Sequence, residues 1–314
     1  MEAIEHKDIQ SKEMNIMGDN RAPLPDNINL RAHTLIEALP YIQKFHGKIM
    51  VIKYGGSAMI DEKLRRMIMQ DIALLKYVGI LPVIVHGGGP AINQMLRRVG
   101  VESKFHQGLR ITDESTLEIT EMVLAGKVNK ELVRQLHLQG VPAVGITGKD
   151  GNLFTARRQV NESADLGLVG EITAVDPKLL CSLFENGFIP VIAPVSMNAE
   201  GTTFNINADD AAVAVASALK AEKLFFLTDV PGVLRNLDDP KSRISRMNAD
   251  EAETLLDDGT ISGGMVPKIR CAIQAVRGNT HTVHIIDGEI SHSLLLEVFT
   301  SEGVGTLIYE SNIH

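Results

Sequence analysis

Glycine-rich segments that could hold an anion occur at three places in this sequence. At the first two, Lys53 is followed by Gly55 and Gly56, and three glycines, Gly87 to Gly89, come before Pro90. Glycine lets the backbone approach a ligand closely, and N–H groups at a helix start form a cradle for phosphate. For Lys53 alone, an anion site and a solvated strand-end lysine are equally good interpretations. Three glycines exceed what a tight turn needs and favour a ligand loop.

The third segment, GGMVPK, runs from Gly263 to Lys268 and opens a helix. Lys268 falls in the first turn, where the helix dipole disfavours a cation. A local rule broken at a glycine-rich helix start often marks a functional position. A bound phosphate would relieve the conflict, and a lysine that holds its charge out in solvent is the alternative interpretation.

Two further segments carry polar residues that could orient a substrate. In NINADD, Asn207 can cap the following helix and Asp209 suits its first turn, but capping leaves Asn205 unexplained. In GLR, Arg110 could bind a carboxylate with two hydrogen bonds, although a lone arginine is more often an ordinary surface residue.

These segments fall between alternating strands and helices. Apolar patterning predicts strands at 48–53, 81–85, 141–146, 188–193, 224–227 and 282–286. It predicts helices at 64–78, 92–99, 114–138, 176–186, 209–219 and 265–276, with a short antiparallel patch over 151–173. The alternation indicates an α/β fold with an open, mainly parallel, doubly wound sheet sandwiched by helices. Ligands bind such sheets at the carboxyl ends of the strands, where the glycine segments lie.

The two ends of the chain suggest further organisation. Residues 1–29 are polar and are expected to form a mobile N-terminal arm. Residues 30–46 form an amphipathic helix that Pro40 should kink or break. Its apolar stripe could pack on its own domain or on another subunit, and the residues leave both open. We also expect two lobes, an N-lobe at 47–195 and a C-lobe at 196–314.

Composition limits the function classes. The 314 residues are 44% apolar and carry a net charge of −8, which argues against a nucleic-acid binder. No signal peptide or transmembrane stretch is visible, so we expect a cytoplasmic protein with no membrane partner. Cys181 and Cys271 lack the spacing of a zinc site or disulfide framework and are expected to be buried thiols. His281 and His284 should face opposite sides of a strand, so no metal bound directly by protein side chains is expected.

The ordered motifs resemble the amino acid kinase superfamily, and within it most closely the N-acetylglutamate kinase family. The resemblance runs from about residue 30 to the end of the chain. Single motifs are shared with carbamate kinase, aspartokinase and glutamate 5-kinase, whereas the combination of GLR, NINAD and GGMVPK is more specific. The matching stretches are VIKYGGSAM (51–59), VHGGGP (85–90), GLRIT (108–112), NINAD (205–209), LTDVPGVL (227–234) and GGMVPK (263–268).

The resemblance implies a reaction and a role for each site residue. The reaction is transfer of the γ-phosphoryl group of ATP, with Mg²⁺, to the side-chain carboxylate of N-acetyl-L-glutamate, the second step of arginine biosynthesis. The catalytic residues would be Lys53, Lys268 and Asp209. The acceptor would be bound by Gly88, Gly89, Arg110 and Asn205. The N-lobe would bind the acetylglutamate and mediate dimerisation, and the C-lobe would bind ATP. The nucleotide would be bound by Gly55, Gly56, Gly87, Thr228, Asp229, Gly264 and Met265.

The N-terminal helix and the tail resemble the arginine-inhibited branch of this family. That branch implies a hexamer, built as a trimer of dimers, and feedback inhibition by L-arginine bound near Glu297 and Gly303. Some relatives also bind a PII signal protein, and nothing in the residues decides this for the present chain.

Two other function classes remain as alternatives. A dinucleotide-binding oxidoreductase could use HGGGP as its cofactor turn, but the GxGxxG spacing and its acidic partner are missing. A non-catalytic arginine or nitrogen sensor would not need Lys53, Lys268 and Asp209.

Overall fold

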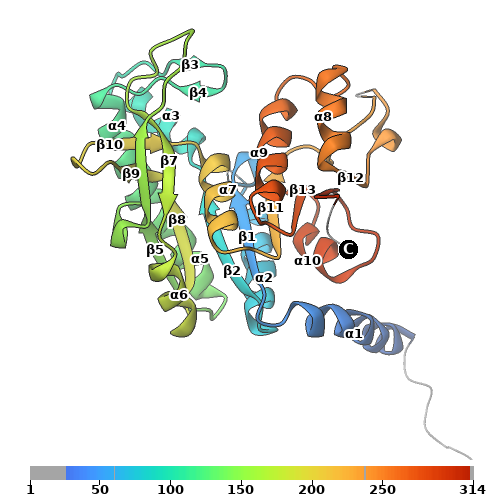
Figure 1. Ribbon diagram of the computed structural model, residues 1–314. Coiled ribbons are helices and arrows are strands. Elements are labelled where there is room, and N and C mark those ends of the chain that lie inside the picture. The colour runs from blue at the N-terminus through green and yellow to red at the C-terminus, as the bar shows by residue number, and fades with distance from the viewer. Residues whose placement is uncertain (1–25, 60, 237, 312–314) are drawn as a thin grey trace, which may run out of the picture. The chain divides into compact units, whose positions relative to one another are not determined.

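The computed structural model describes residues 26–59, 61–236 and 238–311 (Figure 1). Residues up to Pro40 form one compact unit and residues from Tyr41 onward form a second. Helix α1 (Asp26–Phe45) begins in the first unit and continues through Pro40 without ending there. Of the arm expected at 1–29, residues 1–25 lie outside the described residues. Residues 26–29 are helical, so the helix starts earlier than the expected residue 30.

The second unit is built on one eight-stranded sheet with the order β12-β14-β13-β11-β1-β2-β8-β5. These strands are β1 (Ile49–Tyr54), β2 (Leu81–His86), β5 (Ala143–Thr147), β8 (Ile189–Ala193), β11 (Lys223–Thr228), β12 (Arg246–Asn248), β13 (Thr282–Asp287) and β14 (Thr306–Tyr309). All neighbours pair in parallel except β13 and β14, which are antiparallel. The mainly parallel α/β sheet predicted from the sequence is therefore confirmed.

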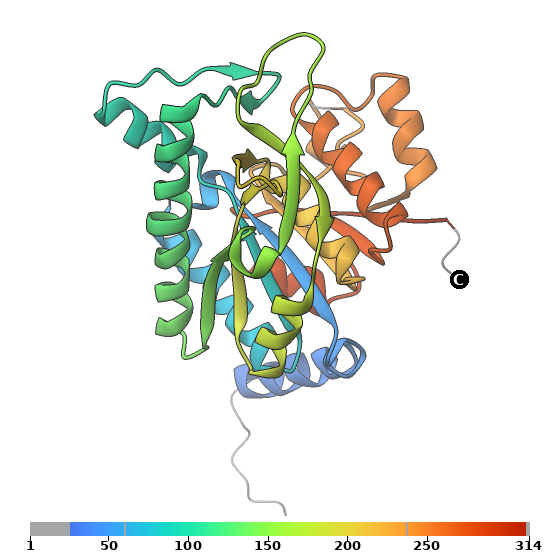
Figure 2. The same cartoon turned by 60° about the vertical axis from the view of Figure 1, so that its left-hand side comes forward.

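Helices cover both faces of this sheet. They are α2 (Glu62–Tyr77), α3 (Gly89–Arg98), α4 (Glu114–Glu121), α5 (Asn129–Leu138), α6 (Lys178–Glu185), α7 (Ala208–Ala218), α8 (Ala249–Asp257), α9 (Met265–Arg277) and α10 (Ser293–Phe299). Short 3-10 turns occur at η1 (Gly56–Met59), η3 (Asp150–Asn152) and η4 (Pro240–Ser242). A π-helical segment, η2 (Met122–Val128), joins α4 to α5, and Figure 2 shows the three as one continuous rod, drawn in green.

Two cores result from the alternation of side chains along each strand. Val51 of β1 packs with residues of α6, α7, α8 and α9 on one face. Its neighbours Met50 and Ile52 point the other way and pack with residues of α2, α3, α5 and α10. The central strands are buried on both sides, as expected of a parallel sheet covered by helices.

A smaller closed set of strands stands beside the main sheet, in the order β10-β7-β6-β9. It consists of β6 (Phe154–Arg158), β7 (Val169–Val175), β9 (Val195–Met197) and β10 (Thr203–Ile206). The antiparallel patch predicted over 151–173 is the β6–β7 pair, but its closure by β9 and β10 was not predicted. A hairpin of β3 (Phe105–His106) and β4 (Leu109–Arg110) precedes α4.

Other sequence-based expectations need correction. No element was expected between 228 and 264 or after 287, where the structure has β12, α8, α10 and β14. Cys271 is buried as expected, but Cys181 is exposed. Across the described ranges, no helix is long and apolar enough to span a membrane.

Candidate active site

Three charged residues from separate elements meet at the carboxyl edge of the sheet. Lys53 is near the end of β1, Asp209 is in the first turn of α7, and Lys268 is in the first turn of α9. The Nζ of Lys53 lies 2.8 Å from Oδ1 of Asp209, and the Nζ of Lys268 lies 3.0 Å from Oδ2. One carboxylate therefore holds two ammonium groups, one on each oxygen.

The charges of this trio leave a net positive site. Burial works to raise the pKa of the Asp209 carboxyl, but the two lysine ammonium groups outweigh burial and hold its pKa below the usual value. Asp209 is thus ionised at neutral pH and neutralises one of two positive charges. It also offsets the unfavourable position of Lys268 at a helix start, so a bound phosphate is not the only group that relieves this conflict.

The position of Asp209 is set by local capping. The side-chain oxygen of Asn207 accepts hydrogen bonds from the backbone N–H groups of Asp209, at 2.7 Å, and Asp210, at 3.4 Å. Three alanines of α7, Ala211, Ala212 and Ala216, are fully buried against the sheet and α9. Small side chains let these elements approach closely, which brings the starts of α7 and α9 together.

The first glycine segment makes room for Lys53. A Cβ atom at Gly55 would lie 2.8 Å from the Lys53 Nζ, so the lysine side chain folds back over this residue. Gly56 has a φ of +70°, a conformation that other L residues rarely adopt. Glycine at both positions thus allows a sharp turn and a lysine directed over the strand end.

The second glycine segment joins β2 to α3, which begins at Gly89 with Pro90 in its first turn. A Cβ atom at Gly88 would lie only 2.5 Å from Cδ2 of Leu124 in η2. A Cβ atom at Gly87 would lie 3.9 Å from the Cβ of Ala208, which is ordinary van der Waals contact. This loop is therefore close to the residue that precedes Asp209.

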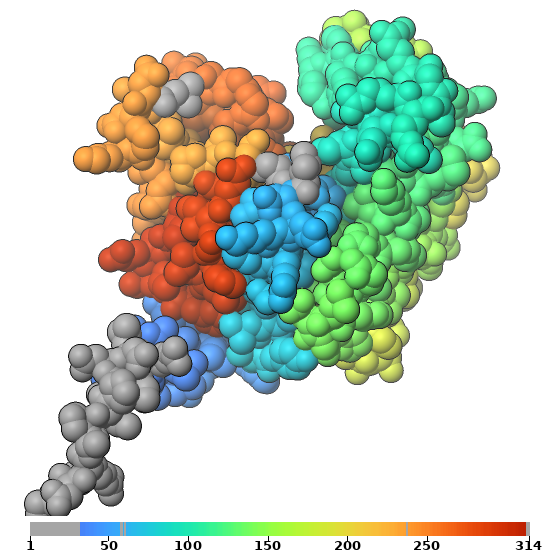
Figure 3. All heavy atoms as spheres, turned by 180° about the vertical axis from the view of Figure 1, so that it is seen from behind, coloured from blue at the N-terminus to red at the C-terminus, as the bar shows by residue number. Residues whose placement is uncertain are grey.

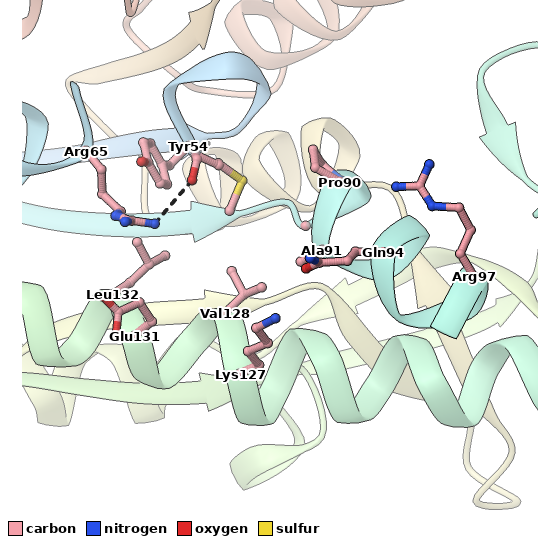
Figure 4. A pocket seen from close by; sticks show the side chains of 12 residues that line it. Tyr54, Arg65, Pro90, Ala91, Gln94, Arg97, Lys127, Val128, Glu131 and Leu132 are labelled. Carbon is pink, nitrogen blue, oxygen red and sulfur yellow. Dashed lines mark hydrogen bonds between the residues drawn. The ribbon is translucent and has the colours of Figure 1, made fainter. Parts of the chain in front are cut away.

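A cavity of about 380 Å³ lies behind this loop, between α2, α3 and the η2–α5 rod. Figure 4 shows Val128 and Leu132 of the rod directed toward Tyr54 and α3 across it. The guanidinium of Arg65, from α2, donates to the Met59 carbonyl oxygen at 3.3 Å. The lining of this cavity is mainly apolar, but it includes charged residues of both signs.

Arg110 and Asn205 are linked through Thr112. The Thr112 hydroxyl donates to the Arg110 carbonyl oxygen at 2.8 Å and accepts from the Asn205 amide at 3.3 Å. The Arg110 guanidinium is buried, donates to the Ser103 hydroxyl and stacks 4.6 Å from the Phe105 ring centre. Burial lowers its pKa, and the described residues give it no carboxylate partner. An arginine in this state is suited to bind a substrate carboxylate.

Four of the seven residues expected to bind the nucleotide lie around one cavity of about 520 Å³, and Gly55, Gly56 and Gly87 are not among its lining residues. Thr228, Asp229, Gly264 and Met265 line it, together with Lys268. Residues 230–234 and 260–263 complete the wall. Seen from behind, a notch separates the orange part of the molecule, which includes α8, from the teal part, which includes β3 and β4 (Figure 3).

Glu297 and Gly303 lie together at a different cavity, of about 460 Å³. The Glu297 carboxylate accepts from the N–H groups of Val304, at 2.6 Å, and Gly305, at 3.1 Å. A Cβ at Gly303 would lie 2.7 Å from its Oε2. The cavity also includes Tyr41, and is thus bordered by the last residues of α1.

Sequence reasoning missed two buried residues of this cavity. Nε2 of His284 lies 2.9 Å from the Lys223 Nζ, and its Nδ1 lies 2.7 Å from Glu297 Oε1. Burial lowers the pKa of His284 to about 4 and that of Lys223 to about 8. His281, the residue before strand β13, is exposed. The alternation along β13 predicted that the two histidines differ, but not that His284 joins this cluster.

A family model described as the amino acid kinase family matches residues 48–287. The chain belongs to this family. The fold and the paired lysines therefore define a class of protein, the kinases that are built on a mainly parallel sheet.

Among curated relatives, the acetylglutamate kinase of Caldanaerobacter subterraneus subsp. tengcongensis is 57% identical over 279 residues, which cover 89% of this chain and 93% of the relative. That of Heliobacterium modesticaldum is 52% identical, covering 88% and 97%. The resemblance to the acetylglutamate kinases, and with it an ATP-dependent carboxyl kinase, is confirmed.

Solved structures agree with the fold. N-acetylglutamate synthase from Neisseria gonorrhoeae, complexed with coenzyme A and N-acetyl-glutamate, has a TM-score of 0.79 at 30% identity. The match covers 90% of this chain and 64% of the synthase chain, so this chain spans about two thirds of that protein. Carbamate kinase from Giardia lamblia, bound to AMP-PNP, has a TM-score of 0.61 at 19% identity and shows the fold alone.

Proposed function

We propose that this protein transfers the γ-phosphoryl group of ATP to the side-chain carboxylate of N-acetyl-L-glutamate, giving N-acetyl-L-glutamyl 5-phosphate, the second step of arginine biosynthesis. The observation that carries the proposal is the pair Lys53 and Lys268 on one partly buried carboxylate, Asp209, at the strand-end edge. The curated relatives that match most of the chain bear the name acetylglutamate kinase.

The proposed phosphoryl transfer requires stabilisation of negative charge rather than proton transfer. The acceptor carboxylate has an ordinary pKa of about 4.3, so it is ionised at neutral pH and needs no general base. The barrier comes from bringing this anion toward a highly charged phosphate, and positioning and electrostatics lower it. Two ammonium groups and the glycine-loop amides supply those interactions.

The residues divide the work between two ligands. Lys53 and Lys268 contact the transferring phosphoryl group, and Asp209 holds both lysines in place. The backbone of Gly88 and Gly89 receives the acceptor end that reacts. Arg110 and Asn205 hold its α-carboxylate, which agrees with an arginine that has no carboxylate partner in the described chain. Thr228, Asp229, Gly264 and Met265 line the cavity that would enclose the nucleotide. Gly55, Gly56 and Gly87 would contact its phosphates.

Magnesium fits this site as an ion carried by ATP. Both Asp209 oxygens face lysines, and the described residues contain no group of three His, Cys, Asp or Glu side chains that could hold a metal ion. When bound, Mg²⁺ neutralises charge on the β- and γ-phosphates. The protein's own part is to place the two ammonium groups of Lys53 and Lys268 where they would contact the transferred group.

The test is a hydroxylamine trap. The protein is incubated with ATP, Mg²⁺ and N-acetyl-L-glutamate, and the acyl phosphate is converted to a hydroxamate that can be measured by its colour with iron. We expect product with N-acetyl-L-glutamate. Product only with carbamate or aspartate would assign the chain to another branch of the family, and NADH binding without product would support the oxidoreductase alternative.

Arginine inhibition is the finer part of the proposal. The cavity beside Glu297 and Gly303 combines a carboxylate, a lysine and backbone groups, which suits the two ends of an amino acid. One solved structure of the N-acetylglutamate synthase of Neisseria gonorrhoeae is a complex with coenzyme A and L-arginine. This structure matches the present chain with a TM-score of 0.75 at 28% identity. Inhibition of the hydroxamate assay by L-arginine tests this, with D-arginine as the control.

We include in the proposal a cytoplasmic hexamer, assembled as a trimer of dimers through the N-terminal helices. The arginine cavity is bordered by the end of α1, so such an assembly would connect arginine binding to subunit contacts. Light scattering with and without arginine tests the assembly, and a dimer that does not respond to arginine would contradict it. Binding of a PII signal protein is left to a pull-down with the purified protein.

A further inference from the structure

His86 ends strand β2 and is completely buried, yet the proposed reaction does not use its imidazole. Its Nδ1 lies 2.8 Å from the carbonyl oxygen of Gly87, the next residue. Its Nε2 lies 3.1 Å from the amide nitrogen of Asn129, the first residue of α5. The ring thus connects the glycine loop to a helix that lies 43 residues further along the chain.

The surroundings of Asn129 decide which way its amide faces. Its oxygen accepts from the Lys130 Nζ at 3.2 Å, and its nitrogen also donates to the Val191 carbonyl oxygen at 2.9 Å. A Cβ atom at Gly145 would lie 1.8 Å from that oxygen, so only glycine leaves room for it. The amide nitrogen therefore faces His86, and this nitrogen can only donate.

This arrangement determines the tautomer of His86. Because Asn129 donates to Nε2, that nitrogen accepts and the ring proton is on Nδ1, from which it is donated to the Gly87 carbonyl oxygen. Burial lowers the pKa of His86 to about 4, so the ring is neutral near pH 7.

The orientation of one peptide unit follows. The N–H of Gly87 donates to the Tyr54 carbonyl oxygen at 2.9 Å, and its own carbonyl is held by His86. In a trans peptide the N–H and the carbonyl point in opposite directions, so the N–H of Gly88 points away from the imidazole. Within the described residues this N–H has no hydrogen-bond partner.

The π-helical segment explains how Asn129 reaches this position. The Asn129 N–H bonds to the Leu124 carbonyl oxygen, five residues back, which is the wider π turn. Leu124 and Val128 then lie against Gly88, at 2.5 Å and 3.6 Å from where its Cβ would be. The rod therefore supports the glycine loop from behind, on the side shown in Figure 4. The side chain of Asn129 reaches the Val191 carbonyl oxygen of β8.

We infer that His86 and Asn129 form a positioning relay, in which the amide orients the imidazole and the imidazole orients the Gly87 peptide so that the Gly88 N–H is presented to the anionic reactants. The relay deepens the proposed function and rests on it. His86 and Asn129 are positioning residues, since neither touches the reacting atoms. A misplacement of about 1 Å in a donor of this kind can cost about 10²-fold in rate.

The test compares variants that keep or remove the hydrogen-bond donor of residue 86 to the Gly87 carbonyl oxygen. His86→Leu removes this donor at similar side-chain volume. We expect its kcat to fall about 10- to 10²-fold, with the KM for ATP within about threefold of wild type. His86→Asn places an amide nitrogen where Nδ1 was and should keep kcat within about threefold. Asn129→Leu frees the ring and should lower kcat about tenfold. Gln135→Leu, which removes another buried amide on the same helix, is the matched control and should keep kcat.

Urea unfolding of each variant separates this relay from a structural role. Rates are expressed per folded molecule, and if His86→Leu does not fold, Asn129→Leu against Gln135→Leu provides the comparison. The relay is overturned if all variants lose stability but keep kcat. It is also overturned if the kcat of His86→Asn falls as far as the kcat of His86→Leu.

A second measurement does not depend on activity. In wild type labelled with ¹⁵N-histidine, the signal assigned to His86 by the His86→Asn variant should report a neutral ring protonated at Nδ1 near pH 7. A ring protonated at Nε2 would overturn the relay. Absence of hydroxamate from wild type would instead contradict the proposed function and leave this tautomer result standing.

Discussion

Lys268 and Asp209 stand in the first turns of two packed helices, and 3.0 Å separates the lysine Nζ from the aspartate Oδ2. The lysine is placed where a helix dipole disfavours it, and the aspartate is placed where a dipole favours it. The pair therefore keeps an ammonium group at a glycine-rich helix start. Because Lys53 contacts the other oxygen, the pair supplies two of the three charges of the site.

The first prediction concerns Lys268. Lys268→Ala should lower kcat about 10²-fold or more, as expected for loss of a donor that stabilises charge in the transition state. The hydroxamate assay measures it. Lys178→Ala, which removes an exposed lysine at another helix start, is the control and should be neutral. A fully active Lys268→Ala enzyme would remove this lysine from the mechanism.

The second prediction separates catalysis from nucleotide binding. Asp209→Asn should lower kcat about 10²-fold, because the two lysines lose the group that positions them. ATP should bind at least as tightly as to wild type, since the site gains one positive charge. Calorimetric titration with ATP and the hydroxamate assay measure the two effects. Asp210→Asn, on the next residue of α7, is the control, and equal loss of binding and kcat would contradict this role.

The third prediction uses the contact between Gly88 and Leu124. Gly88→Ala should lower kcat at least tenfold, because the added methyl group would lie 2.5 Å from the Leu124 side chain and displace the loop. The double variant Gly88→Ala/Leu124→Ala removes the clash and should recover part of the activity. Gly89→Ala, where a Cβ meets no atom within 4 Å, is the steric control. No recovery in the double variant would show that the contact is not the cause.

The fourth prediction concerns acid stability. His86 has an ordinary pKa of 6.5 in the unfolded chain and a pKa of about 4 when buried in the fold, chiefly because of desolvation, with a smaller contribution from the charge of Lys130. The unfolded state thus binds more protons between these values. The contribution of His86 to stability is complete above about pH 6.5 and is lost as the pH falls toward 4, by about 3 kcal/mol in total.

Urea unfolding over this pH range measures the effect by comparison with His86→Asn. The variant should have a shallower loss of stability on acidification. His284, whose pKa is lowered to about 4, and Asp71, whose pKa is raised to about 6 mainly by burial, are present in both proteins and cancel in the comparison. Parallel pH profiles for the two proteins would show that His86 does not titrate as stated.

The fifth prediction tests the arginine cavity. Glu297→Gln should raise the concentration of L-arginine needed for half inhibition at least tenfold, because a charged hydrogen bond is worth about 1.5–3 kcal/mol. Activity without arginine should be unchanged, since Glu297 is not part of the catalytic site. Glu302→Gln changes an exposed carboxylate of the same cavity and is the control. Unaltered inhibition in Glu297→Gln would place arginine elsewhere.

The sequence by itself determined the layered α/β fold and the segments of the candidate site. Buried strands and amphipathic helices follow from local periodicity, and a run of three glycines after a strand exceeds what a turn alone requires. Lys268 at a helix start was visible because a helix dipole acts within one turn, so its conflict with a cation is a local signal. The matched motifs gave Arg110 and Asn205, but not the Thr112 hydroxyl that joins them.

Only the tertiary structure decided which distant residues share a buried site. His86 meets Asn129 across 43 residues, and Lys223 meets His284 across 61. Neither pair has a local signal, because each depends on where two elements pack. The His86–Asn129 pair depends also on the room left at Gly145 and on the π turn before Asn129. The antiparallel edge strand β14 and the closure of the small barrel are of the same kind. Periodicity reports which face of an element is buried, and packing alone reports what lies against it.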